Sequence, residues 1–146
     1  MKTNIMLSLA IAATLLFSCA KHRQPTYEVG QEAFGGIVLK LDASGEHGVV
    51  VAKEDQVTMS TGNNFSESSA IVTAYAEGGK GWRLPTKDEL LAIYAMRASL
   101  GSFESWYYWT STTKGYQNYA VYFGNGTVNS YCHVNSNFCS RAVKDF

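Results

Sequence analysis

The N-terminal segment limits how much of this chain can enter a folded domain. Lys2 gives it a positive start, residues 5–17 are almost wholly apolar, and the sequence Leu-Phe-Ser-Cys ends at Cys19. An apolar helix of that length spans roughly 20 Å, which is too short for the ~30 Å hydrocarbon layer of a bilayer. The run is therefore typical of a signal peptide, and we expect residues 1–18 to be removed from the mature protein.

Cys19 predicts a lipid anchor. A small residue followed by cysteine after leucine-rich sequence is typical of a bacterial lipobox, in which the cysteine becomes a diacylated N-terminus. Two acyl chains hold a protein stably on a membrane, whereas one chain is marginal. We therefore expect a lipoprotein of the cell envelope, in the outer membrane of a Gram-negative bacterium, with the face left open. An ordinary secretory signal with a chance cysteine is the alternative.

The remaining chain has the size and the charge of one nearly neutral domain. Without Lys2 it carries about one net negative charge and no basic stripe, which argues against nucleic acid as a partner. Its 9 Tyr and 13 Gly against 2 Pro favour strands and turns. We divide the chain into a signal peptide at 1–18, a polar tether at 19–33 and a folded domain at 34–146.

Strands are expected on both sides of a helical middle. The β-rich runs 37–41 and 49–52 predict a hairpin, and His47 lies in its turn, where it is expected to bond backbone rather than to act in catalysis. Four later strands are expected at 107–112, 118–123, 127–131 and 140–145.

Two helices are expected between these strands. A short helix is predicted over 70–76, and the residues from 55 to 67 are read as polar and irregular. A longer helix is predicted from Lys87 to about Ala98. It begins with a capping box, because Thr86 and Glu89 have the spacing at which each side chain bonds the other residue's N–H.

The strongest hairpin signal is Asn125-Gly126, which predicts a two-residue turn. In that register Phe123 faces Val128, and the polar side chains of both strands share the opposite face. Tyrosine rings can stack on sugars and amides can bond hydroxyl groups, so we expect ligand binding there. The candidate residues are Asn118, Tyr122, Thr127, Asn129, Tyr131 and His133. The alternative is a solvated or helix-covered face whose tyrosines only stabilise the sheet.

Cys132 and Cys139 are predicted to form a disulfide. If Asn135-Ser136 turns the chain, the two cysteines lie opposite each other on paired strands, within bonding range. An exported compartment is oxidising, which favours the bond. The alternative is a metal site of Cys132, His133 and Cys139, but this set lacks a fourth ligand and the usual spacing, so no metal is expected.

The sequence contains no motif of a catalytic or cofactor site. A glycine-rich phosphate loop, a nucleophile elbow and a zinc-protease helix are all absent. None of His22, His47 and His133 is placed by sequence near a serine nucleophile or a carboxylate pair. We expect no enzyme and no cofactor, and little effect of calcium. A hydrolase of envelope polymers is a minor alternative.

Five motifs occur along the chain in an order that resembles one family. They are Gly35–Gly48, Trp82–Leu90, Tyr108–Thr112, Phe123–Gly126 and Arg141–Phe146. Together they are similar to the Lcl C-terminal domain family, formerly a domain of unknown function, over roughly residues 34–146. The resemblance implies a C-type-lectin-like α+β fold in which two helices flank small antiparallel sheets and the domain ends lie close together.

The resemblance also implies an exported or lipid-anchored surface protein, since members are typically of that kind, and some members are implicated in adhesion to polyanionic glycans. This chain departs from that pattern: it lacks a basic patch, and it lacks the Glu-Pro-Asn and Trp-Asn-Asp motifs of calcium-dependent lectins. We therefore expect a non-enzymatic cell-envelope lipoprotein whose lectin-like domain binds a glycan or an envelope protein. A structural or accessory subunit of an envelope assembly is the alternative.

Overall fold

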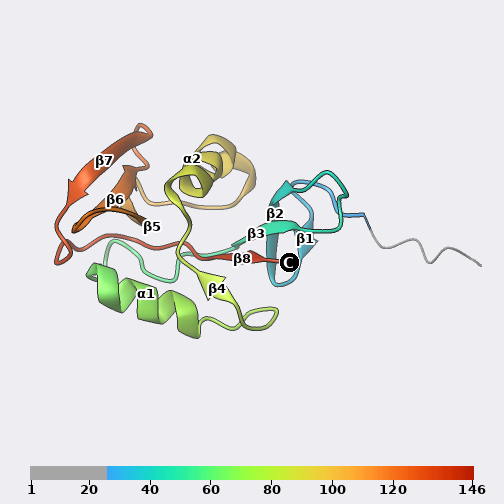
Figure 1. The fold of residues 1–146 in the computed structure, drawn as a ribbon, viewed down its shortest axis with the longest axis horizontal. Helices are drawn as coiled ribbons and strands as arrows, with labels where there is room; N and C mark the ends of the chain where they lie inside the picture. Colours follow the sequence, from blue (N-terminus) through green and yellow to red (C-terminus); the bar gives the residue numbers. More distant parts are fainter. Residues whose placement is uncertain (1–25) are drawn as a thin grey trace, which may run out of the picture.

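The computed structural model describes residues 26–146. The expected signal peptide, Cys19 and the first part of the expected tether lie outside the described residues. The described chain contains two helices and two antiparallel sheets (Figure 1). The α+β class expected from the sequence is confirmed.

The first sheet joins the two ends of the described chain. Its strand order is β1-β2-β3-β8-β4, so the last strand lies between two strands that come much earlier. The hairpin of β2 and β3 agrees with the prediction, whereas the two-residue strands β1 and β4 were not expected. The strands are β1 (Glu32–Ala33), β2 (Gly36–Leu41), β3 (Gly48–Ala52), β4 (Trp82–Arg83) and β8 (Val143–Asp145).

The chain joins this sheet before residue 34. The Tyr27 N–H donates to the Gly45 oxygen at 3.0 Å. The Tyr27 ring lies 5.1 Å from that of Phe34 and 5.3 Å from that of Phe146, measured between centroids. Part of the segment predicted as tether is thus folded, because its polar backbone finds partners in β2 and in the β2–β3 turn.

The first helix starts earlier than predicted, and the second starts where predicted. Helix α1 (Phe65–Ala74) begins after Asn64, whose Oδ1 accepts the Glu67 N–H at 3.0 Å. An N-cap Asn followed three residues later by Glu is a start signal that lies within the run read as irregular. Helix α2 (Lys87–Met96) has the predicted capping box and ends in a 3-10 turn, Arg97–Ser99.

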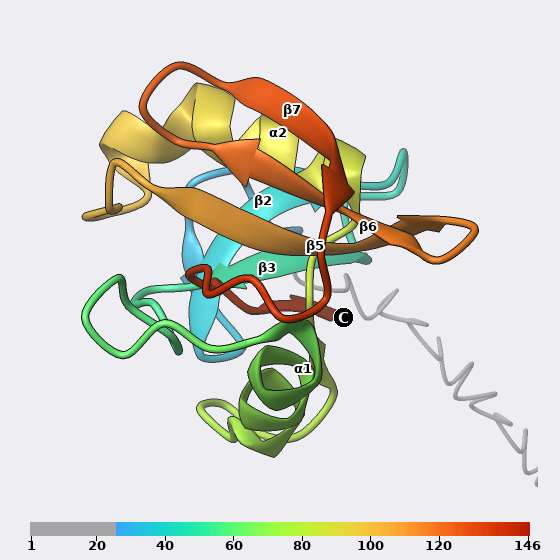
Figure 2. The ribbon, with the colours of Figure 1, turned by 90° about the vertical axis from the view of Figure 1, so that its left-hand side faces the viewer.

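The second sheet is covered on both faces. It contains β5 (Tyr107–Lys114), β6 (Gln117–Tyr122) and β7 (Thr127–Cys132) in that order. Helix α2 packs on one face, through Leu90 and Ile93 against Val121, and it lies along the sheet in Figure 2. Trp109 of the other face is buried in a second apolar cluster with Val72 of α1. This apolar burial is the main force that holds the helices to the sheet.

The loop between β6 and β7 differs from the predicted two-residue turn. It spans residues 123–126, so Val121 rather than Phe123 faces Val128. The Gly126 N–H donates to the carbonyl oxygen of the last β6 residue at 2.7 Å, and the φ of Gly126 is 79°, which closes a four-residue loop. Phe123 leaves the strand because its ring packs in the core against aromatic side chains beside α2.

Cys132 and Cys139 are free thiols, so the predicted disulfide is wrong. Cys132 lies on β7, the outer strand of the second sheet, and pairs with Asn118 of β6. Cys139 forms a bridge with Tyr108 along the opposite edge, beside β5. Three strand spacings, roughly 14 Å, separate them, whereas a disulfide needs Cα atoms within about 7 Å. The prediction assumed adjacent strands, but the connection crosses the end of the sheet. Burial raises the pKa of Cys132 to about 11 and that of Cys139 to about 12.

Candidate binding site

A hollow of about 490 Å³ lies where the β5–β6 turn meets the end of β7. Two of its aromatic side chains are largely exposed: Tyr116 at 102% and Tyr131 at 74%. We call this site the Tyr116–Tyr131 hollow. Its lining residues are Tyr116, Gln117, Tyr131, Cys132, His133 and Val134. Its volume lies within the range of small-molecule sites in proteins.

Tyr116 is exposed because of the turn that carries it. Lys114 pairs with Gln117, so Gly115 and Tyr116 are the two central residues of a tight hairpin. A φ of 62° at Gly115, the first central position, is typical of a type II′ turn. The second position then points its side chain into solvent. A large ring where small polar residues are usual is the sequence signal that would have identified this residue.

A β-bulge in β7 exposes Tyr131. One residue separates Asn118 from Ala120 on β6, whereas two residues separate their partners Cys132 and Asn129 on β7. The extra residue interrupts the strict alternation of side chains. The Oδ1 of Asn129 accepts the Tyr131 N–H at 3.0 Å and so holds the bulge in place.

His133 and its neighbours link the hollow to helix α1. The Nδ1 of His133 accepts the Asn135 N–H at 3.2 Å, which assigns the ring proton to Nε2 and makes that nitrogen a donor. The carbonyl oxygen of Val134 accepts the Phe65 N–H, the first of α1, at 3.0 Å. The hollow therefore combines exposed rings with neutral polar groups on a fixed backbone.

The structure brings two of the predicted ligand-binding residues to this hollow, Tyr131 and His133. Asn118 is buried, and Tyr122 is half-buried with its ring 4.9 Å from that of a β5 tyrosine. Asn129 is half-buried, and its Oδ1 is used within the bulge. The prediction assumed unbroken alternation along β7, so it grouped side chains that the bulge separates. Tyr116, Gln117 and Val134 were missed.

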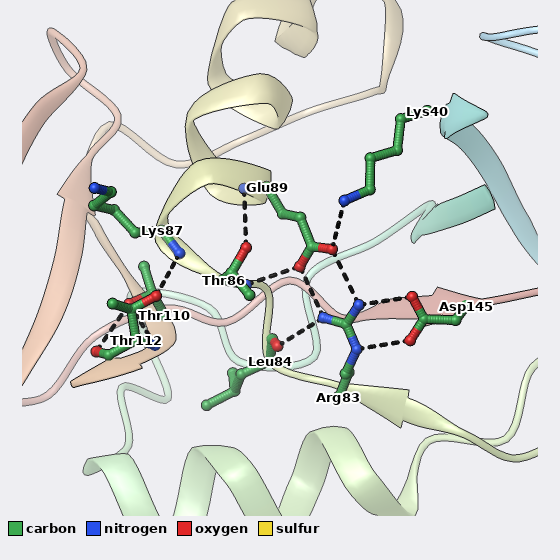
Figure 3. A network of polar contacts seen from close by, with 9 residues as sticks. All are labelled: Lys40, Arg83, Leu84, Thr86, Lys87, Glu89, Thr110, Thr112 and Asp145. Carbon is green, nitrogen blue, oxygen red and sulfur yellow. Dashed lines mark hydrogen bonds and ion pairs between the residues drawn. The ribbon is translucent and has the colours of Figure 1, made fainter. Parts of the chain in front are cut away.

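A polar network joins α2 to the first sheet (Figure 3). Arg83 donates from Nη1 to Glu89 Oε2 at 2.8 Å and from Nη2 to Glu89 Oε1 at 3.0 Å. Its Nε and Nη2 also donate to the two carboxylate oxygens of Asp145, at 3.0 and 2.9 Å. Lys40 adds an ion pair to Glu89 at 3.1 Å. Strands β2, β4 and β8 are thereby tied to the first turn of α2.

Glu89 is the centre of this network. Burial alone would raise its pKa, but hydrogen bonds from Arg83, the Thr86 N–H and Lys40 outweigh that effect and hold the pKa at about 2. The side chain is 5% exposed, and both of its oxygens already have donors. Glu89 is therefore a structural ion, not a free acid or base.

A second hollow, of about 590 Å³, has a buried ion pair at its floor. The Nε of Arg141 donates to Asp55 Oδ1 at 2.6 Å. Its two Nη atoms donate to the carbonyl oxygens of Ala52, Lys53 and Ser102. Burial raises the pKa of Asp55, against the opposing charge of Arg141 and a hydrogen bond from a β5 tyrosine. All three guanidinium nitrogens thus have partners within the protein, and the pair fixes the surrounding loops.

Within residues 26–146, no group of three or more His, Cys, Asp and Glu side chains is placed to hold a metal ion. None of the helices in this part of the chain has the length and apolar character needed to cross a membrane.

Comparison with known families decides which family this fold represents. The family model of the Lcl C-terminal domain matches residues 41–144. The chain belongs to the Lcl C-terminal domain family. No curated protein matches the chain.

In this Lcl C-terminal domain, motifs that carry the resemblance build the fold. Trp82 is buried, and its Nε1 donates to the Glu77 oxygen at 2.9 Å. Arg83 and Glu89 form the ion pair of Figure 3, and Thr86 caps α2. The two exposed tyrosines lie within the matched span but outside these motifs. The motifs that carry the family resemblance therefore maintain the fold, and none of them contains an exposed tyrosine of the hollow.

Proposed function

We propose that this protein is a non-enzymatic, lipid-anchored cell-envelope protein with a lectin-like domain that binds a carbohydrate in the Tyr116–Tyr131 hollow. The observation that carries the proposal is the pair of exposed rings, held by a tight turn and a bulge, at one hollow. Exposed apolar side chains that gather at one place mark an interaction site, whereas single scattered ones do not. Tyrosine gives a flat apolar face and a polar hydroxyl, which suits a sugar ring.

The lining of the hollow favours an uncharged sugar. Gln117 offers both a donor and an acceptor, and the Nε2 of His133 offers a donor for a hydroxyl group. None of the six lining residues is a carboxylate, a lysine or an arginine. A sulfated or carboxylated glycan would find no cation in the lining, and a calcium-bridged sugar would find no acidic ligand there.

The non-enzymatic assignment is supported by how the buried acids are used. Asp55 is engaged by Arg141, and Glu89 is engaged by Arg83. The thiol in the hollow, Cys132, is buried, and burial raises its pKa to about 11, so little thiolate forms at neutral pH. The membrane partnership and the outer-membrane location are supported by the N-terminal sequence that ends at Cys19.

A glycan array tests this function. The soluble mature chain starting at Ala20 should retain uncharged oligosaccharides, and binding should persist in a calcium chelator. Tyr116→Ala and Tyr131→Ala should each weaken binding of the best array glycan roughly 2- to 10-fold, because an aromatic contact contributes about 0.5–1.5 kcal/mol.

Trp106→Ala is the matched control, since Trp106 is a partly exposed ring of the same domain that does not line the hollow. It should bind the same glycan as wild type does. An array without uncharged glycans among its hits, or tyrosine variants that bind as the control does, would contradict the proposal.

A further inference from the structure

We propose that the surface around Tyr27 and Phe34 rests on the lipid bilayer, so that the Tyr116–Tyr131 hollow points away from it. This inference rests on the lipid anchor at Cys19 in the proposed function. It adds to that function a second interaction surface, whose partner is the interfacial layer of the membrane.

The sequence sets an upper limit on the distance between anchor and domain. Seven peptide bonds join Cys19 to Thr26. An extended chain advances at most about 3.6 Å per residue, so this link spans no more than about 25 Å in any conformation. A folded domain of about 120 residues is roughly 35 Å across. The link is too short for the domain to turn its Thr26 end away from the bilayer.

The attachment point lies at the opposite end of the molecule from the hollow. Thr26 precedes Tyr27, whose N–H bonds Gly45 in the β2–β3 turn. In Figure 1 the start of the described chain lies beside β1 and β2, and β7 lies at the far end. Figure 2 shows the same separation in depth, with β7 in front and β2 behind. A domain held by Thr26 therefore presents β7 to the surroundings.

The Tyr27 end exposes apolar side chains and holds one of them in a strained backbone. Val29 is 51% exposed and Phe34 is 39% exposed. The φ of Phe34 is 53°, a left-handed value that bulky residues rarely adopt, in a two-residue turn usually made by Asn, Asp or Gly. Backbone strain of this kind costs on the order of 1 kcal/mol and is a pointer to function. Tyr is enriched at the membrane interface, and Phe is common on the apolar face of segments that lie in it.

The strained turn is fixed rather than loose. The Nζ of Lys144 donates to the Phe34 oxygen at 2.7 Å and to the Gly78 oxygen at 2.8 Å. The ring of Phe34 stacks on that of Phe146, with 4.5 Å between centroids. These contacts fix the position of the Phe34 ring on the first sheet.

The charge of this end selects among lipids. Asp42 and Glu46 lie in the β2–β3 loop beside Tyr27, and Lys21 and Arg23 lie in the link between Cys19 and Thr26. Anionic headgroups repel the two acidic groups and attract the two basic ones, so neither sign of charge dominates. The near-neutral end therefore fits zwitterionic lipid, such as phosphatidylethanolamine, and needs no charged lipid to bind.

Lipid quenching of single labels tests the orientation. The full lipoprotein is placed in vesicles of phosphatidylethanolamine and phosphatidylcholine that carry a headgroup nitroxide quencher. Glu28→Cys places a fluorophore at the Tyr27 end, and Lys114→Cys places it beside the hollow. Both positions are exposed, whereas the native Cys132 and Cys139 are buried and escape labelling in the folded protein. Quenching should be at least threefold stronger at position 28 than at position 114.

A second pair of variants separates the apolar surface from the short link. Insertion of 12 Gly and Ser residues after Arg23 should leave most of the contrast, because the apolar end still holds the bilayer. Adding Phe34→Asn, which suits the left-handed turn, should then abolish it. Equal quenching at the two positions without the spacer, or a contrast that survives in the spacer protein with Phe34→Asn, would overturn the inference.

Vesicle flotation distinguishes this failure from failure of the proposed function. A protein that floats but shows equal quenching overturns the orientation alone. A protein that stays in solution overturns the anchor and, with it, the orientation. Binding of the array glycan by the soluble chain is measured separately and depends on neither result.

Discussion

The five-stranded sheet and the end of the three-stranded sheet that carries the hollow use their polar and aromatic side chains in opposite ways. In the five-stranded sheet, Arg83 pairs both with Asp145 and with Glu89 of α2 (Figure 3). Trp82 of the same sheet is buried. At the end of the three-stranded sheet, Tyr116 and Tyr131 expose their rings to solvent. The difference separates residues that build the fold from residues that are available for a ligand. Family motifs identify the first group, and exposure identifies the second.

The largest loss of stability is expected at the buried ion pair beside the first sheet. Arg141→Met leaves the Asp55 carboxylate 8% exposed and without its cation, so the free energy of unfolding should fall by about 3–5 kcal/mol. Urea titration measures this change. Arg97→Met, at an exposed arginine that stacks on Tyr94, is the control and should cost less than about 1 kcal/mol. Similar losses in the two variants would contradict the assignment of Arg141 to the fold.

The next effect is a dependence of stability on pH that originates at Glu89. Its pKa is about 2 in the folded protein against an ordinary value of 4.5, so the folded state favours the charged form. Stability from this group is fully present above about pH 5 and is lost as the pH falls toward 2. The loss should be on the order of 3 kcal/mol. Glu89→Gln should show a flatter profile between pH 5 and 3 than wild type, and an equally steep profile would show that other groups titrate instead.

The capping box should contribute less than the ion pairs. Thr86→Ala removes the acceptor of the Glu89 N–H at the start of α2, and the expected cost is about 1 kcal/mol. Thermal unfolding of the variant measures this cost. Thr73→Ala is the control, because Thr73 lies within α1 and caps nothing. If the two substitutions cost the same, the cap is not what stabilises α2.

The smallest stability effect is expected at the hollow, where the comparison between the sheets is sharpest. Tyr116→Ala and Tyr131→Ala should each change the free energy of unfolding by less than about 0.5 kcal/mol, because exposed rings bury little apolar area. The same variants should lose affinity for the array glycan. A cost above 1 kcal/mol at Tyr131 would place its ring in the fold rather than in a binding site.

Local signals in the sequence predicted much of the fold. The spacing of Thr86 and Glu89 gave the start of α2, and the β-rich runs gave the β2–β3 hairpin. These signals depend on neighbours within a few residues, which is why they survive without tertiary information. The pair Asn64 and Glu67 carried the same kind of signal for α1 but lay in a polar run that masked it.

Features set by distant contacts were not predictable in this way. The bulge that exposes Tyr131 depends on how β7 pairs with β6, and no local sequence pattern within β7 predicts it. The disulfide prediction failed because Cys139 pairs with β5, which only the three-dimensional path reveals. Phe123 left its expected strand position for the core beside α2. The candidate site was therefore predicted only in part, since its residues meet across a turn and a bulge.

The strand order of the first sheet also controls when this domain can fold. β8 lies between β3 and β4, yet it follows every other helix and strand of the described chain. Asp145 completes the ion-pair network, and Arg141 completes the buried pair with Asp55. A chain emerging from the ribosome therefore lacks the strand that joins β4 to the rest of the sheet until residues 143–145 have been made. Among the described strands β4 pairs with β8 alone, so the first sheet cannot be completed before this last strand is available.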